Sequence, residues 1–144
     1  GEYTIVVNEP GIVDIKVIAR DKNGDINETA IMSFQVQELP NPDITINGTK
    51  GGDINKDVLL HSERLELHSR IDHIDTHFEI IEFILSDEKT SNNGYRSNGA
   101  YFSLQQKRWL QSQTSGTKIY IKNIILKLNN NERKVTQPLE FIIE

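Results

Sequence analysis

The sequence contains no cysteine, one methionine, one tryptophan and four prolines among its 144 residues. Without cysteine the chain has neither a disulfide framework nor a thiolate site, which excludes cysteine-based redox chemistry. It also lacks any apolar run near the roughly 20 residues that a membrane helix requires. Its start at Gly1 shows no signal-peptide pattern and no methionine, so we interpret the chain as a fragment or a processed form.

An excess of positive charge is absent as well. The 16 basic and 21 acidic residues are interspersed along the chain and give a net charge of −5. Binding to nucleic acid needs a basic stripe, so we expect no nucleic-acid partner. The plain interpretation is a soluble domain of about 100 residues, large enough to fold without disulfides, with part of a neighbouring domain.

A pattern of alternating apolar residues occurs twice, at residues 15–36 and 122–143. Ile124 in the second copy corresponds to Val17, 107 positions earlier. In both copies a polar turn separates two runs in which every second residue is apolar. This period places one face of a strand in a core and the other in water. The repeat therefore predicts the end of one β-sandwich followed by a complete second one.

Prolines at positions 40 and 42 mark a domain boundary, because proline lacks a backbone donor and holds the chain extended. We predict three parts: the last strands of a preceding domain at 1–38, a proline linker at 39–42, and the second domain at 43–144. In the first part the alternation predicts strands at 3–7, 13–19 and 31–36. Three strands are too few to close a sandwich, so missing strands, a partner chain or the second domain must cover their apolar face.

The second domain contains local patterns that predict particular elements. Residues 78–85 are apolar at nearly every position, as expected of a strand at the centre of the fold. Ser103 and Gln106 match a capping box, in which each side chain satisfies a backbone donor at the start of a helix. The apolar parity changes within 119–128, which predicts a β-bulge near residues 122–123.

The histidines cluster at positions 61, 68, 73 and 77, which makes them the densest group of possible metal ligands. If the segment is extended, His73, Asp75 and His77 share one face and form a candidate divalent-metal triad. If it is helical, only His73 and His77 align. The alternative is that these are solvated side chains in a polar connection. We favour that alternative and expect no metal, because no cysteine and no orienting partner accompany them.

Patterns typical of enzymes are missing. The sequence contains neither the Gly-x-Ser-x-Gly elbow of serine hydrolases nor the His-Glu-x-x-His helix of zinc proteases. Glu79 and Glu82 would lie on opposite faces of a strand and cannot act together on one bond. The glycine-rich loop at 48–52 lacks the ending of a phosphate-binding loop, so we expect close backbone packing there. We therefore predict no catalytic residue, no cofactor and no enzymatic activity.

Short motifs in the second half of the chain follow a recognisable order. They are Thr-Lys-Gly-Gly-Asp-Ile at 49–54, Ile-Asp-Thr-His-Phe-Glu-Ile-Ile-Glu-Phe at 74–83, Ser-Asn-Gly-Ala-Tyr-Phe-Ser at 97–103 with Gln106, Gly-Thr-Lys at 116–118, and Arg133 with Pro-Leu-Glu-Phe at 138–141. From Asp43 onward this order resembles the C-terminal domain of the GldM/PorM family, periplasmic proteins of the type IX secretion and gliding motor of Bacteroidetes. Residues 34–42 resemble the junction that enters this domain.

The resemblance implies an all-β fold, namely an immunoglobulin-like β-sandwich with one short helix, preceded by a partial second β-sandwich domain. It also implies a homodimeric periplasmic shaft whose tip contacts an outer-membrane-associated ring, with a membrane link only through a missing upstream anchor. Two departures stand out: the transmembrane helix and helical first domain are absent, and residues 74–77 replace a more aromatic and acidic segment. The chain is therefore either cut from a longer protein or a stand-alone relative.

Two functions agree with this reading. The first is a non-catalytic docking domain of a cell-envelope secretion machine, located in the periplasm. The second is a generic cell-envelope adhesion module that recognises glycan or peptide. In either case Tyr95, Arg96 and Tyr101, near the polar loop at 86–99, are candidate partner-binding residues, although they could equally cover the edge of the sandwich.

Overall fold

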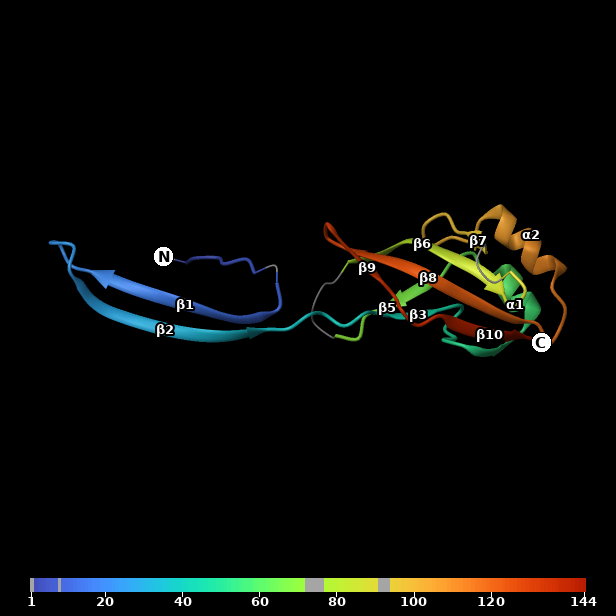
Figure 1. Cartoon of the computed structure of the whole chain (residues 1–144), viewed down its shortest axis with the longest axis horizontal. Coiled ribbons are helices and arrows are strands. Elements are labelled where there is room, and N and C mark those ends of the chain that lie inside the picture. Colours follow the sequence, from blue (N-terminus) through green and yellow to red (C-terminus); the bar gives the residue numbers. More distant parts are fainter. Residues whose placement is uncertain (1, 8, 72–76, 91–93) are drawn as a thin grey trace. The chain divides into compact units, whose positions relative to one another are not determined.

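The computed structural model describes residues 2–7, 9–71, 77–90 and 94–144. The chain divides into two compact units, Gly1–Pro40 and Asn41–Glu144. Both units are built from strands, and two short helices belong to the second (Figure 1). The prediction of an all-β fold is confirmed.

The first unit is an antiparallel ribbon of β1 (Gly11–Arg20) and β2 (Ile26–Val36). In its turn, the Asp21 carboxylate accepts the backbone N–H groups of Asn23 and Asp25, at 2.8 and 2.9 Å. Gly24 follows with a φ of 83°, a left-handed angle that glycine adopts without strain. The polar residues of this turn thus stabilise the turn itself.

The predicted strand at residues 3–7 is wrong, because residues 2–7 lie outside any strand. Alternating side chains favour an extended chain, but a strand also needs a neighbour that completes its backbone hydrogen bonds. The ribbon does gather its apolar side chains on one face, since Val13 lies opposite Phe34 and Ile15 opposite Met32. Met32 and Phe34 are each 49% exposed, so this face is poorly covered by the described chain.

The second unit contains a larger and a smaller sheet. The larger has the order β4 (Gly52–Ile54), β10 (Leu139–Ile143), β8 (Lys118–Leu128), β6 (Phe78–Asp87), β7 (Tyr95–Arg96), and β9 (Asn131–Lys134) pairs with the far half of β8. All these pairs are antiparallel except β4 with β10. The smaller sheet pairs β3 (Asp43–Thr45) with β5 (Glu66–His68). The middle strand is therefore β8, and β6, expected at the centre, lies one place nearer the edge.

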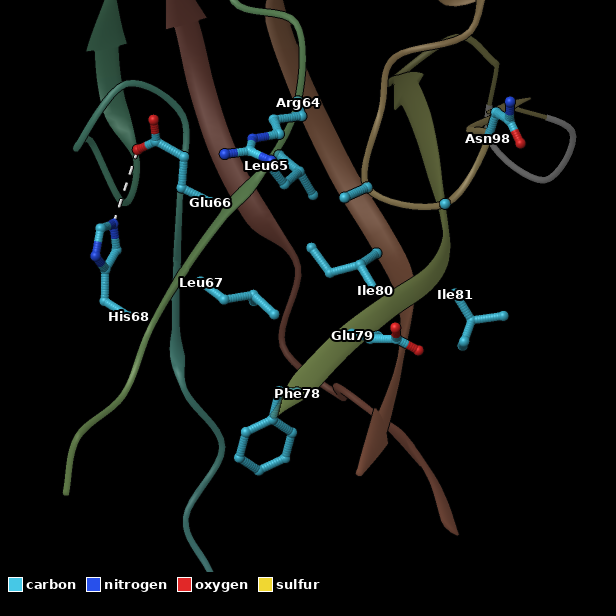
Figure 2. A pocket seen from close by; sticks show the side chains of 12 residues that line it. Arg64, Leu65, Glu66, Leu67, His68, Phe78, Glu79, Ile80, Ile81 and Asn98 are labelled. Atoms are coloured by element: carbon cyan, nitrogen blue, oxygen red, sulfur yellow. Dashed lines mark ion pairs between the residues drawn. The ribbon is translucent and has the colours of Figure 1, made fainter. Parts of the chain in front are cut away.

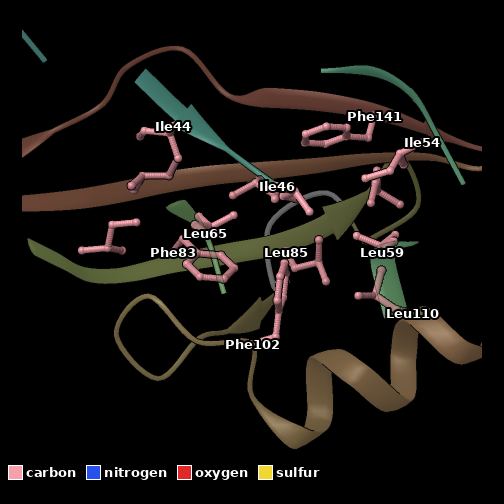
Figure 3. Packing of buried hydrophobic residues seen from close by; sticks show 14 of the residues in the cluster. Ile44, Ile46, Ile54, Leu59, Leu65, Phe83, Leu85, Phe102, Leu110 and Phe141 are labelled. Atoms are coloured by element: carbon pink, nitrogen blue, oxygen red, sulfur yellow. The ribbon is translucent and has the colours of Figure 1, made fainter. Parts of the chain in front are cut away.

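The core of this unit lies where strands and helices converge on Phe83, which is fully buried and meets the Phe102 ring edge-on at 5.3 Å (Figure 3). Strand β8 contributes Ile119 and Ile121 from its first half and Ile124 and Leu126 from its second. The change of parity between these halves is the predicted bulge. Asn123 has a φ of 50°, and the three steps from Lys122 to Ile125 face two steps of β6.

Two helices complete the second unit, α1 (Lys56–His61) and α2 (Leu104–Ser112). Helix α1 begins at Asn55, whose side chain accepts the backbone N–H groups of the first turn. Helix α2 begins with the capping box predicted from Ser103 and Gln106, both halves of which are present. Gln106 is fully buried, and its side-chain amide also donates to the Tyr95 carbonyl at 2.8 Å, which ties the helix to β7.

Candidate docking surfaces

The candidate metal triad cannot be assembled from the described residues, since His73 and Asp75 lie outside them. Elsewhere in the cluster, His61 Nδ1 lies 2.7 Å from the Asp57 carbonyl oxygen, and His68 Nε2 lies 3.0 Å from the Thr45 hydroxyl. Among the described residues, no three His, Asp or Glu side chains are grouped closely enough to hold a metal ion. These two histidines thus belong to local hydrogen-bond networks.

The three candidate contact residues have different environments. The Tyr95 ring packs against Trp109, with centroids 5.6 Å apart, so it belongs partly to the packing of α2 on β7. Arg96 is exposed and donates to the Glu82 carboxylate at 2.7 Å. Tyr101 is half exposed and has the Arg64 guanidinium 5.9 Å from its ring centroid. Arg96 and Tyr101 therefore remain accessible, whereas Tyr95 is largely committed to the fold.

The segment that carries these residues is held firmly on β6. Ser97 pairs twice with Phe83: its N–H donates to the Phe83 carbonyl, and its hydroxyl accepts the Phe83 N–H at 2.8 Å. The same hydroxyl donates to the Gly99 carbonyl at 2.8 Å. Gly94 lies directly over the Leu85 backbone, where a Cβ atom would overlap. A partner would consequently meet a preformed surface here.

A groove of about 860 Å³ lies beside this segment, between β5 and the first half of β6. It is lined by residues 64–68, 78–81 and 98–100. Figure 2 shows Leu67 and Ile80 pointing into the space between the two strands. Sequence reasoning missed this groove. The alternating apolar residues of both strands were visible, but their meeting across a gap depends on the tertiary fold.

Charges on β3, β5 and β6 are partly neutralised within the domain. The Glu66 carboxylate accepts the Thr45 hydroxyl and the Gly48 N–H, each at 3.1 Å. Hydrogen bonds from Lys50 and Arg70 to Asp43, both at 2.6 Å, hold the pKa of that carboxyl below its ordinary value. Glu79, in contrast, forms no ion pair with any described residue, although Lys127 lies opposite it in β8.

The profile of the GldM C-terminal domain family matches residues 40–144, which covers the whole second unit. A comparison with curated proteins finds no match. Within the described residues, neither helix has the length and apolar character needed to cross a membrane.

Proposed function

The chain belongs to the GldM C-terminal domain family, and on that basis we propose that it is a non-catalytic docking domain in the periplasm. Membership of this family associates the chain with type IX secretion and gliding. Proteins of the family are structural components of secretion machinery, and the family is not known to contain enzymes. The match to residues 40–144 carries the proposal, because it spans every element of the second unit. The partners in this proposal are proteins of the outer-membrane-associated ring.

The partner-binding surface in this proposal is centred on Arg96 and Tyr101. Tyr95 supports the same segment by packing against Trp109. A tyrosine and an arginine that are accessible on a rigid segment have the composition typical of interface hot spots. The backbone bonds of Ser97 support this assignment, since they fix the surface before binding and reduce the entropy lost in the complex.

The proposed assembly is a homodimer. The half-exposed Met32 and Phe34 on the apolar face of the first unit support this, because soluble proteins seldom leave such faces without a partner. Sedimentation of the full chain across a concentration series tests it. A monomer at all concentrations would contradict the proposed dimer and would leave the proposed docking role unaffected.

The docking role is tested by capturing ring components from a Bacteroidetes envelope extract with the immobilised full chain. We expect identification of the ring lipoprotein or its partner, and a loss of at least about tenfold with Arg96→Ala combined with Tyr101→Ala. The control combines Arg108→Ala on α2 with Tyr120→Ala on β8, which removes the same residue types elsewhere. Capture that is absent for the wild-type chain, or undiminished for the first variant, would count against the function or the surface respectively.

A further inference from the structure

Strand β6 has an open edge along its first half. Residues 78–80 and Glu82 pair with β8 on one side. On the other side β7 pairs only with Ile84 and Leu85, so no described strand continues along 78–82. Strand β5 is open in the same way, because it pairs with β3 and with no second described strand. The groove is thus bordered by the unpaired edge of β6, which carries backbone donors and acceptors.

The orientation of the β6 edge follows from Gly99. A Cβ on Gly99 would lie 3.5 Å from the Ile80 carbonyl oxygen, so that carbonyl faces the 98–100 segment and not β8. The N–H and C=O of one strand residue point to the same side, and alternate residues repeat the direction. Phe78 and Ile80 therefore direct their backbone groups away from β8, and the Ile80 carbonyl faces Gly99 in the wall of the groove.

The interior of the groove is apolar. Leu65 and Ile80 are 2% and 6% exposed and belong to the core, while Leu67, Phe78 and Ala100 are partly buried against it. One end is closed where the Leu65 N–H donates to the Ala100 carbonyl at 2.9 Å. An extended chain would satisfy the backbone edge of β6 and cover the partly buried apolar side chains.

The charges at the groove specify the chemistry of such a chain. Glu79 on β6 is exposed and without an ion pair among the described residues, whereas the Glu66 carboxylate is turned away from β6 and accepts from Thr45 and Gly48 (Figure 2). Opposite charges across neighbouring strands stabilise the pairing, and like charges weaken it. A basic residue beside Glu79 is therefore favoured and an acidic one is disfavoured.

We propose that this groove receives an extended segment of a partner protein, added as a strand beside residues 78–81 of β6. The segment has apolar side chains at alternate positions, which face the partly buried Leu67 and Phe78, and a lysine or arginine between them beside Glu79. This inference rests on the proposed function only in taking the partner to be a protein.

The first test uses the full chain and a labelled, end-capped peptide, Thr-Val-Lys-Val-Lys-Val-Thr, followed by fluorescence anisotropy. We expect saturable binding that Glu79→Lys weakens about fivefold. The peptide with glutamate in place of lysine should bind the wild-type chain weakly and the Glu79→Lys chain better. Glu132→Lys on β9 is the matched control and should change binding less than twofold. A peptide that binds all three chains equally would overturn the proposal.

The second test addresses the backbone directly. N-methylation of peptide amides at alternate residues should abolish binding in the parity that faces β6 and leave it in the other, because only one set of amides joins the ladder. Amide resonances of residues 78–81 should shift in the complex. Equal effects of both parities, or shifts confined to other segments, would refute strand addition. Self-association of the chain that the peptide displaces would assign the groove to a second copy and would also refute the proposal.

The outcomes separate the groove from the docking role. If the peptide fails while ring components are still captured by the wild-type and Glu79→Lys chains alike, the groove proposal fails and the function stands. If peptide binding shows the expected charge and parity dependence while no ring component is captured, the groove proposal stands and the assignment to the secretion ring fails.

Discussion

Lys56 and Lys107 each close the carboxyl end of the other's helix. Lys56, the first residue of α1, donates to the carbonyl oxygens of Gln111 and Gln113 at the end of α2. Lys107 in α2 donates to the carbonyl of Leu60 at 2.7 Å and to that of Ser62, at the end of α1. The last carbonyls of a helix lack partners within it and favour a nearby cation. Because α1 has only six residues, its stability must come from such contacts.

We expect Lys107→Met to lower the free energy of unfolding by about 1–3 kcal/mol, since it keeps the aliphatic stem but leaves two partly buried carbonyls without a donor. Burial lowers the pKa of Lys107, a cost that the Glu63 carboxylate partly offsets, so some of the loss is regained when the charge is removed. Urea denaturation measures the change, and Lys89→Met in an exposed loop is the control. Equal stability of Lys107→Met and Lys89→Met would show that the hydrogen bonds from Lys107 to the end of α1 contribute nothing to stability.

Gly94→Ala should loosen β7 from β6, because the new Cβ would overlap the Leu85 carbonyl oxygen and the Ile84 side chain. We expect a loss of at least about 2 kcal/mol, with a change in Trp109 fluorescence because Tyr95 packs on that ring. Gly116→Ala provides the comparison: its φ is 84° and no atom lies within 4 Å, so only backbone strain of about 1 kcal/mol applies. A smaller effect at Gly94 than at Gly116 would contradict the close approach.

Ser86→Ala should stabilise the domain. The Ser86 hydroxyl is buried and has no hydrogen-bond partner among the described groups, so its removal spares a desolvation penalty of about 1 kcal/mol. The midpoint of thermal unfolding should rise by about 4–8 °C for a domain of this size. Ser103→Ala should act in the opposite direction because it removes the cap of α2. If Ser86→Ala destabilises the chain, the hydroxyl has a partner after all.

Asp43 predicts a pH dependence at the start of the second unit. Its hydrogen bonds from Lys50 and Arg70 lower the pKa of the carboxyl below 3.8, so the ionised form is favoured by folding. The stability it provides is present above pH 3.8 and disappears as the pH falls through the lower folded-state pKa. Urea midpoints of the wild-type chain and Asp43→Asn should therefore differ at pH 6 and converge as the pH falls through the folded-state pKa of the carboxyl. A gap that stays constant with pH would rule out this linkage, and Asp53→Asn serves as the control.

Local chemistry was readable from the sequence. The capping box of Ser103 and Gln106 depends on residues three apart, and the bulge at Asn123 depends on a parity change within one strand. The close packing expected of the glycine loop also appears at Gly51, where a Cβ would lie 2.9 Å from the Glu140 carbonyl oxygen. The second hairpin has its turn at Asn129, but its return is split into β9 and β10, which alternation alone did not reveal.

Strand pairing and burial between distant parts of the chain could not be predicted from the sequence. For Tyr95 the sequence left open whether it contacts a partner or covers the sandwich edge, and its packing against Trp109, on a helix that follows later in the chain, became visible only in the structure. The groove between β5 and β6 arises because β7 stops at Arg96 and the smaller sheet has only two described strands. Periodicity determined which face of each strand is apolar, since that depends on neighbouring residues. Only the tertiary structure decided which edges remain open, because an edge is defined by strands distant in the chain.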